Sequence, residues 1–168
     1  QEEALSMSDR VVVLRDGCIE QIGTPRDVYE SPANLFVAHF LGEINVFDVQ
    51  VCELLDDRRM LGDVEGQRLE FSSRAGRFQP GQHIHALLRP EDMRLLPADS
   101  ERGLPGQVIE RNYKGMMLET LIQLESGKQL LASEFFDEDA PDLDYRLGQR
   151  VRISWVPSWE VLLANETA

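Results

Sequence analysis

The sequence is poor in positive charge, in cysteine and in long apolar segments. Its 168 residues include 17 lysines and arginines against 30 aspartates and glutamates, for a formal net charge of -13. Binding to a nucleic-acid backbone depends on basic side chains that release counterions, so this balance argues against a nucleic-acid partner. The excess of acid would attract cations, although in most soluble proteins it serves mainly to maintain solubility.

Cys18 and Cys52 are the two cysteines of the chain. They form no CxxC pattern, so they indicate free thiols in a reducing compartment instead of a metal site. No run reaches the roughly 18 apolar residues that a membrane-spanning helix needs. Residues 1–3 also lack the positive charge of a signal peptide. We therefore expect a cytoplasmic location, with any membrane association made through a partner protein and no direct insertion.

Motifs for catalysis are missing as well. No GxxxxGK[ST] motif is present to bind a triphosphate, and no serine or cysteine motif accompanies the histidines. His83 and His85 lie two residues apart on an expected strand and could share a metal ion. We favour the interpretation that they are ordinary, partly exposed strand residues without a metal. We expect this chain alone to be no enzyme and to hold no cofactor or metal.

The first 42 residues carry local signals for a small α+β unit. An Asp-Gly pair at residues 16–17 separates two short apolar runs, which predicts a β-hairpin because both central turn positions need positive φ. Thr24 before Pro25, with Asp27 following, predicts the start of a short helix. Ser31 before Pro32 repeats this arrangement and predicts the start of another helix.

Beyond Gly42 the apolar period changes from helical to alternating, as in Phe47, Val49 and Val51. Short alternating runs separated by glycine-containing turns predict a small all-β barrel or sandwich. We place the boundary between Leu41 and Val46, so that residues 1–43 and residues 44–168 form separate domains.

The β region contains an internal repeat. Residues 81–84 match residues 148–151, and residues 65–69 match residues 126–130. Two related halves are therefore expected, at about residues 46–96 and 104–163. The second half carries an acidic insertion without a basic residue, which makes this loop a candidate for function.

Several blocks resemble one class of transporter. Residues 1–4, residues 7–17 and Gly23-Thr24-Pro25 are similar to the end of an ABC-transporter ATPase domain. Leu88-Arg89-Pro90-Glu91-Asp92-Met93 is similar to a motif of the TOBE regulatory domain, which is built from OB-type barrels. The blocks at residues 110–119, 133–139 and 154–161 resemble the ATP-binding subunit of spermidine/putrescine ABC importers.

The resemblance covers nearly the whole chain. It implies a mainly β fold, in which a duplicated OB-type (TOBE) barrel domain follows a short α+β remnant of an ABC ATPase domain. It also implies that the full-length parent binds ATP and Mg and couples ATP hydrolysis to polyamine uptake, whereas this chain supplies regulation and dimerisation. The implied partners are a second copy, permease subunits and an extracytoplasmic polyamine-binding protein, with the parent peripheral on the inner face of the membrane.

Two other interpretations remain open. The chain could be a free-standing OB-type protein that binds or senses a small ligand, and residues 1–42 would then form a complete, well-buried unit. The transporter interpretation instead predicts an exposed apolar edge or patch around residues 11–13. The same domain could also belong to an importer of sugar, sulfate or iron, because the N-terminal motifs are shared among these importers.

The acidic insertion is our candidate polyamine-sensing site. Carboxylates with aromatic faces between them suit a chain of ammonium groups joined by methylenes. The candidate residues are Glu134, Phe135, Phe136, Asp137, Glu138 and Asp139, with Trp155 or Trp159 as a further aromatic face. The alternative is a solvated acidic loop whose two phenylalanines fill the barrel.

Overall fold

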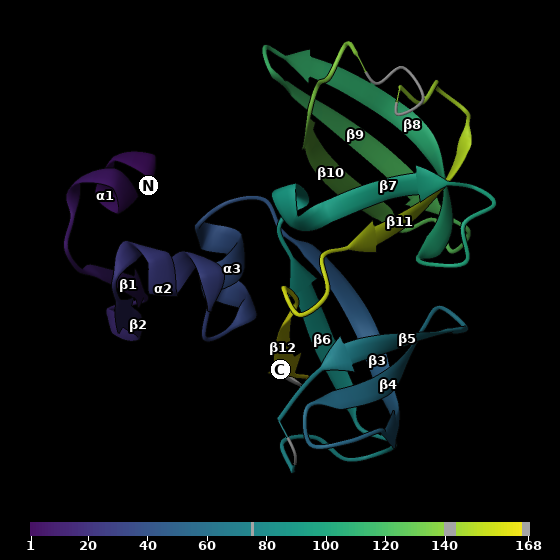
Figure 1. Cartoon of the computed structure of the whole chain (residues 1–168). Coiled ribbons are helices and arrows are strands. Elements are labelled where there is room, and N and C mark those ends of the chain that lie inside the picture. The colour runs from purple at the N-terminus through teal and green to yellow at the C-terminus, as the bar shows by residue number, and fades with distance from the viewer. Residues whose placement is uncertain (75, 140–143, 166–168) are drawn as a thin grey trace. The chain divides into compact units, whose positions relative to one another are not determined.

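The computed structural model of the chain describes residues 1–74, 76–139 and 144–165. It contains two compact units, Gln1–Ile44 and Asn45–Ala168. Strands form most of the second unit, and helices are few and short (Figure 1). The prediction of a mainly β fold is confirmed.

The first unit is built from short elements around a small core of Val13, Val28, Val37 and Leu41. Its elements are α1 (Glu2–Met7), β1 (Val11–Arg15), β2 (Cys18–Gly23), α2 (Pro25–Glu30) and α3 (Leu35–Phe40). β1 and β2 pair antiparallel. Asp16 and Gly17, between these two strands, have φ values of 50° and 77°. The predicted hairpin is therefore confirmed, with positive φ at both central positions of its turn.

The two helix starts have different outcomes. Thr24 begins α2 as predicted, because its hydroxyl accepts the Asp27 N–H at 3.2 Å and the Asp27 carboxylate accepts the Thr24 N–H at 3.3 Å. The second start is wrong, since Ser31 instead ends α2. Asn34 caps α3 by accepting the Val37 N–H at 2.9 Å, and it also donates to Glu20 of β2 at 2.7 Å. The hydrogen bond to Glu20 holds the Asn34 side chain in the position that caps α3.

Within its described residues, the second unit contains ten strands and one short 3₁₀ helix, η1. The first run comprises β3 (Asn45–Leu54), β4 (Arg59–Val64), β5 (Gln67–Ser72), β6 (His83–Leu88), η1 (Pro90–Asp92) and β7 (Met93–Pro97). The second run comprises β8 (Leu104–Lys114), β9 (Met117–Leu124), β10 (Gln129–Phe135), β11 (Arg150–Trp155) and β12 (Val161–Ala164).

Each run gives its last strand to the sheet of the other run (Figure 1). One five-stranded sheet has the order β12-β6-β3-β4-β5, and the other has the order β7-β11-β8-β9-β10. The two orders become identical when β3 is aligned with β8 and each later strand with its counterpart. This correspondence supports the proposal of two related halves. It also shows that neither half completes its own sheet.

Contacts between the two sheets involve both apolar and polar groups. Trp155 of β11 lies against Phe47 and Phe71 of the other sheet, with ring centroids 5.4 Å and 5.7 Å away. Asn45 donates to the Leu131 carbonyl and accepts the Leu131 N–H, both at 2.8 Å. The second unit therefore has one continuous core shared by both sheets.

Candidate functional site

Glu134 lies on β10, at the edge of its sheet, and its side chain turns toward the opposite edge. Its Oε1 accepts the N–H of Leu95 on β7 at 3.2 Å. Burial raises the pKa of the Glu134 carboxyl above its usual value. The Leu95 N–H and the nearby Arg94 and Arg111 guanidinium groups lower this pKa, because they favour the charged form. Glu134 therefore joins the two edge strands of its sheet and is not free in a solvated loop.

The two predicted phenylalanines differ in their surroundings. Phe135 has 74% of its surface exposed. Phe136 packs edge-on against Tyr113, with ring centroids 5.2 Å apart, and its N–H donates to the Met116 carbonyl at 2.8 Å. Tyr113 and Met116 are themselves exposed, at 57% and 72%. Phe135 is thus too exposed to fill the barrel, and together these side chains give an apolar surface at the end of β8, β9 and β10.

The three acidic residues that follow are exposed. The Asp139 N–H donates to the Asp137 carboxylate at 2.9 Å, which gives this stretch a local turn. The rest of the predicted insertion, residues 140–143, lies outside the described residues. Asp137, Glu138 and Asp139 thus present carboxylates to solvent beside exposed Phe135.

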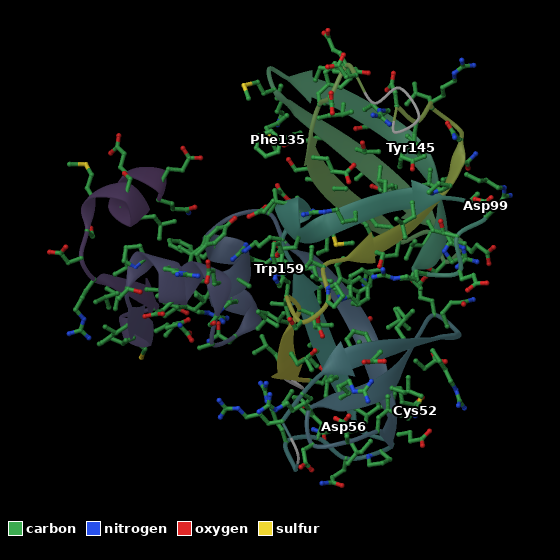
Figure 2. The ribbon with its side chains drawn as sticks, viewed as in Figure 1. Cys52, Asp56, Asp99, Phe135, Tyr145 and Trp159 are labelled. Atoms are coloured by element: carbon green, nitrogen blue, oxygen red, sulfur yellow. The ribbon has the colours of Figure 1, made fainter. Side chains whose placement is uncertain are left out.

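The two tryptophans do not join this loop. Trp155 is 7% exposed and is packed in the core against Phe47 and Phe71. Its ring faces are occupied there, so it offers no open aromatic face to a ligand beside residues 134–139. Trp159 is 50% exposed and lies on the segment between β11 and β12, well apart from Phe135 in Figure 2.

Sequence reasoning missed a group of polar side chains near Glu134. The Arg111 side chain is 7% exposed and its Nη2 lies 3.4 Å from a carboxylate oxygen of Asp144. Tyr145 is buried, with its hydroxyl unpaired within the described part of the chain. Burial raises the pKa of Tyr145, and the charge of Glu134 raises it further. The sequence gives only a weak signal for this group. Arg111 lies on an expected strand and Tyr145 follows the insertion, but nothing in their spacing predicts that they meet.

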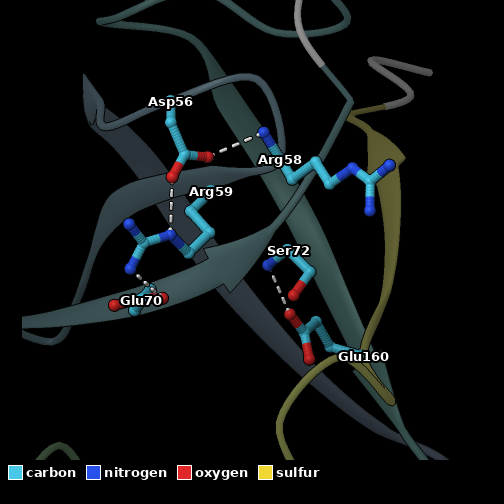
Figure 3. Close-up of polar contacts among 6 residues, drawn as sticks. All are labelled: Asp56, Arg58, Arg59, Glu70, Ser72 and Glu160. Atoms are coloured by element: carbon cyan, nitrogen blue, oxygen red, sulfur yellow. Dashed lines mark hydrogen bonds and ion pairs between the residues drawn. The ribbon is translucent and has the colours of Figure 1, made fainter.

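Glu160 is another carboxylate that joins two sheet edges, and it is more deeply buried than Glu134. It is 8% exposed, and its Oε1 accepts the N–H of Ser72 on β5 at 2.7 Å (Figure 3). This bond links β5 to the start of β12, the two edges of that sheet. Burial raises the pKa of the Glu160 carboxyl, and the Ser72 N–H lowers it. Each sheet therefore has one glutamate that joins its edges, partly buried in the case of Glu134 and buried in the case of Glu160.

Within residues 1–74, 76–139 and 144–165, no group of three potential metal ligands occurs around the histidine pair or elsewhere. His85 has Nδ1 3.1 Å from the Asp48 carboxylate and Nε2 3.0 Å from the Asn165 side-chain oxygen. Nε2 therefore contacts the residue after β12, whereas Nδ1 lies near the Asp48 carboxylate of β3 without hydrogen-bond geometry among the described residues. His83 is exposed on the same strand.

Comparison with known proteins defines the class of the second unit. Residues 86–163 match the family model of the TOBE domain. The fold also resembles a solved structure of the cytoplasmic molybdate-binding protein ModG, with a TM-score of 0.59. That match covers 72% of this chain and 96% of the other at 16% identity, so it concerns the fold alone. The predicted TOBE, OB-type architecture is confirmed.

The sequence is also similar to particular transport proteins. It is 54% identical, over 99% of its length, to the spermidine/putrescine import ATP-binding protein PotA of Escherichia coli (strain K12). The PotA protein of Shigella flexneri matches at the same identity and coverage. The chain spans 44% of the length of these relatives. The predicted resemblance to the ATP-binding subunit of a spermidine/putrescine importer is confirmed.

The raised pKa of Glu160 predicts a specific pH dependence of stability. The folded protein holds this proton to higher pH than the unfolded chain, whose carboxyl titrates near 4.5. The stabilisation is therefore complete below pH 4.5 and is lost as the pH rises through the folded-state pKa. Glu160→Gln removes this titration and keeps an oxygen for the Ser72 N–H. We expect its free energy of unfolding, relative to the unsubstituted chain, to increase from pH 4 to pH 7 in urea titrations.

Asp56→Asn is the matched control, with the opposite expected slope. Asp56 accepts the Arg58 N–H and bonds to Arg59, and these contacts lower its pKa. Its stabilising contribution is present at neutral pH and is lost as the pH falls. The change in the free energy of unfolding caused by Glu160→Gln would contradict the role given to Glu160 if it did not vary with pH. It would do so too if it varied with pH in the same direction as the change caused by Asp56→Asn.

Proposed function

We propose that this chain is the regulatory and dimerising part of the ATP-binding subunit of an ABC importer for polyamines. The observation that carries the proposal is 54% identity, over 99% of the chain, to relatives named as spermidine/putrescine import ATP-binding proteins. The TOBE domain at residues 86–163 is consistent with it. The importer itself couples ATP hydrolysis to uptake through the whole subunit, of which this chain corresponds to the smaller part.

The apolar surface of the first unit supports this assignment over a free-standing ligand-binding protein. Val13 is buried, whereas Val12, Leu14 and Ile19 on the same hairpin are 48%, 56% and 60% exposed. A hairpin with an apolar outer face suits a segment that completes a larger domain. We therefore assign residues 1–43 to the end of an ABC ATPase domain and residues 44–168 to the regulatory domain.

The parent subunit would bind ATP and Mg in its other part and work with two permease subunits and an extracytoplasmic polyamine-binding protein. Its place would be the cytoplasmic face of the membrane. Among the described helices, none is long and apolar enough to cross a bilayer.

A homodimer through the β domain would keep two ATPase domains together. Sedimentation of the chain at high micromolar concentration tests this contact, and a monomer there would count against it.

A second proposed role is feedback sensing of polyamine by the loop at residues 134–139. The support is the exposed ring of Phe135 beside the exposed carboxylates of Asp137, Glu138 and Asp139. Ammonium groups would pair with these carboxylates, and the aromatic ring would contact the methylenes. Exposed pairs of this kind are individually weak and sensitive to salt. The role thus predicts modest affinity that depends on several contacts at once.

Uptake by a chimaera tests the transport assignment. The chimaera joins this chain to the remaining part of the Escherichia coli relative and is expressed in cells that lack their own polyamine importer. We expect uptake of labelled spermidine close to that of the relative, because the two C-terminal parts are 54% identical. A chimaera that accumulates to normal levels but imports no spermidine would contradict the assignment.

Calorimetric titration with spermidine tests the sensing role separately. We expect binding in moderate salt that weakens by about tenfold in an Asp137→Asn/Glu138→Gln variant, in which two carboxylates are neutralised. The control is Asp56→Asn/Asp57→Asn, another exposed acidic pair in the same unit. Absence of binding heat, or equal weakening in both variants, would rule out a site in this loop.

A further inference from the structure

A pocket of about 380 Å³ lies in the second unit, away from the acidic loop. Its walls are β5, the connection between β7 and β8, and the segment from the end of β11 to β12. Side chains of both charges line it, and those that matter for the argument are Arg68, Glu70, Glu101, Arg102, Trp155 and Glu160. The volume is within the range of small-molecule sites.

The fold holds two walls of this pocket in place. Gly103 has a φ of 84°, and a Cβ at this position would lie 2.5 Å from the Ile153 carbonyl oxygen. The Gly103 carbonyl accepts a hydrogen bond from the Arg152 side chain at 2.9 Å. The β7–β8 connection is thus fastened closely to β11, and only glycine permits this approach.

Glu160 places a buried, incompletely paired carboxylate in the pocket wall. The side chain is 8% exposed, and Oε1 is taken by the Ser72 N–H. Oε2 is buried and has no hydrogen-bond partner among the described residues. The Glu160 backbone, the Trp155 side chain and the Ser158 backbone also lower the carboxyl pKa, but none of them donates to Oε2 with hydrogen-bond geometry. A buried carboxylate oxygen without a donor is costly, so this atom points to a ligand that brings one.

Two arginines supply the opposite charge. Arg68 and Arg102 line the same pocket and are exposed. Within the described ranges neither forms an ion pair, whereas Glu70 is 3.4 Å from Arg59. Arg68 and Arg102 are therefore available for a carboxylate, which guanidinium groups bind well.

The mixture of charges selects the class of ligand. A simple anion would satisfy the arginines and leave Glu160 Oε2 without a donor. A diamine would satisfy Glu160 and pair its second ammonium group with Glu101, but it would leave Arg68 and Arg102 without an anionic partner. We propose that this pocket binds a free α-amino acid, whose ammonium group donates to Glu160 Oε2 and whose carboxylate pairs with Arg102 or Arg68. This inference does not depend on the polyamine loop or on the transport assignment.

Three related small molecules separate the possibilities. Ornithine carries an α-carboxylate and two amines, norvaline is the same amino acid without the side-chain amine, and putrescine is ornithine without the carboxylate. Calorimetric titration of the purified chain with each is expected to give binding of ornithine and norvaline. We expect putrescine to bind at least about tenfold more weakly than ornithine at this site, because the charge-assisted pairing with arginine is lost.

Variants assign the binding to the pocket. The double variant Arg68→Gln/Arg102→Gln changes two exposed residues, and it should weaken the binding of ornithine by about tenfold or more while leaving thermal stability unchanged. Glu160→Gln should weaken the binding of ornithine and of norvaline to the same extent. Arg150→Gln, an exposed arginine outside the pocket, is the control and should change neither. Failure of both amino acids to bind at millimolar concentration would overturn the proposal. So would binding of putrescine as tight as that of ornithine, or an affinity for ornithine that is unchanged in Arg68→Gln/Arg102→Gln.

Discussion

The structure of the second unit depends on an exchange of strands between its two halves. β7 follows η1 into the sheet of the second run, and β12 returns from the second run to the first sheet. Neither half therefore has a complete sheet by itself. A non-local pairing of this kind must form late, because each half needs the other before its apolar faces are covered. Trp155, packed against Phe47 and Phe71 of the other sheet, contributes to the same mutual dependence.

The exchange also leaves each sheet with two edges, and in both sheets a glutamate joins them, partly buried in one and buried in the other. Glu134 reaches from β10 to β7, and Glu160 reaches from the start of β12 to β5. The acids come from different positions of the two runs, so this arrangement is not a simple copy. Burying a carboxylate is unfavourable unless hydrogen bonds compensate. Each of these two side chains joins strands of the fold and also lies beside other charged groups, in a region where we propose ligand binding.

Local signals allowed much of the fold to be predicted, and long-range contacts account for what could not be. Asp16-Gly17 and Thr24 act through their immediate neighbours, so the hairpin and the first helix start follow from sequence. Asn34 could not be chosen over Ser31, because its advantage comes from a bond to Glu20 on another element. Trp155 was expected to offer a ligand face, and only its packing across the two sheets shows that the face is occupied. The acidic run at residues 137–139 was visible in the sequence, whereas Glu160 acquires its environment from β5, far away in the chain.

Deletion of the last strand tests the strand exchange most directly. Hydrogen exchange would be measured on the whole chain and on a chain that ends at Glu160. Because β12 pairs with β6, the account predicts that the deletion removes protection mainly from β6 and β3, in the first half, while β8 and β9 keep more of theirs. Loss of protection confined to β8–β11, or unchanged protection of β6, would contradict the exchange of strands on which this description is based.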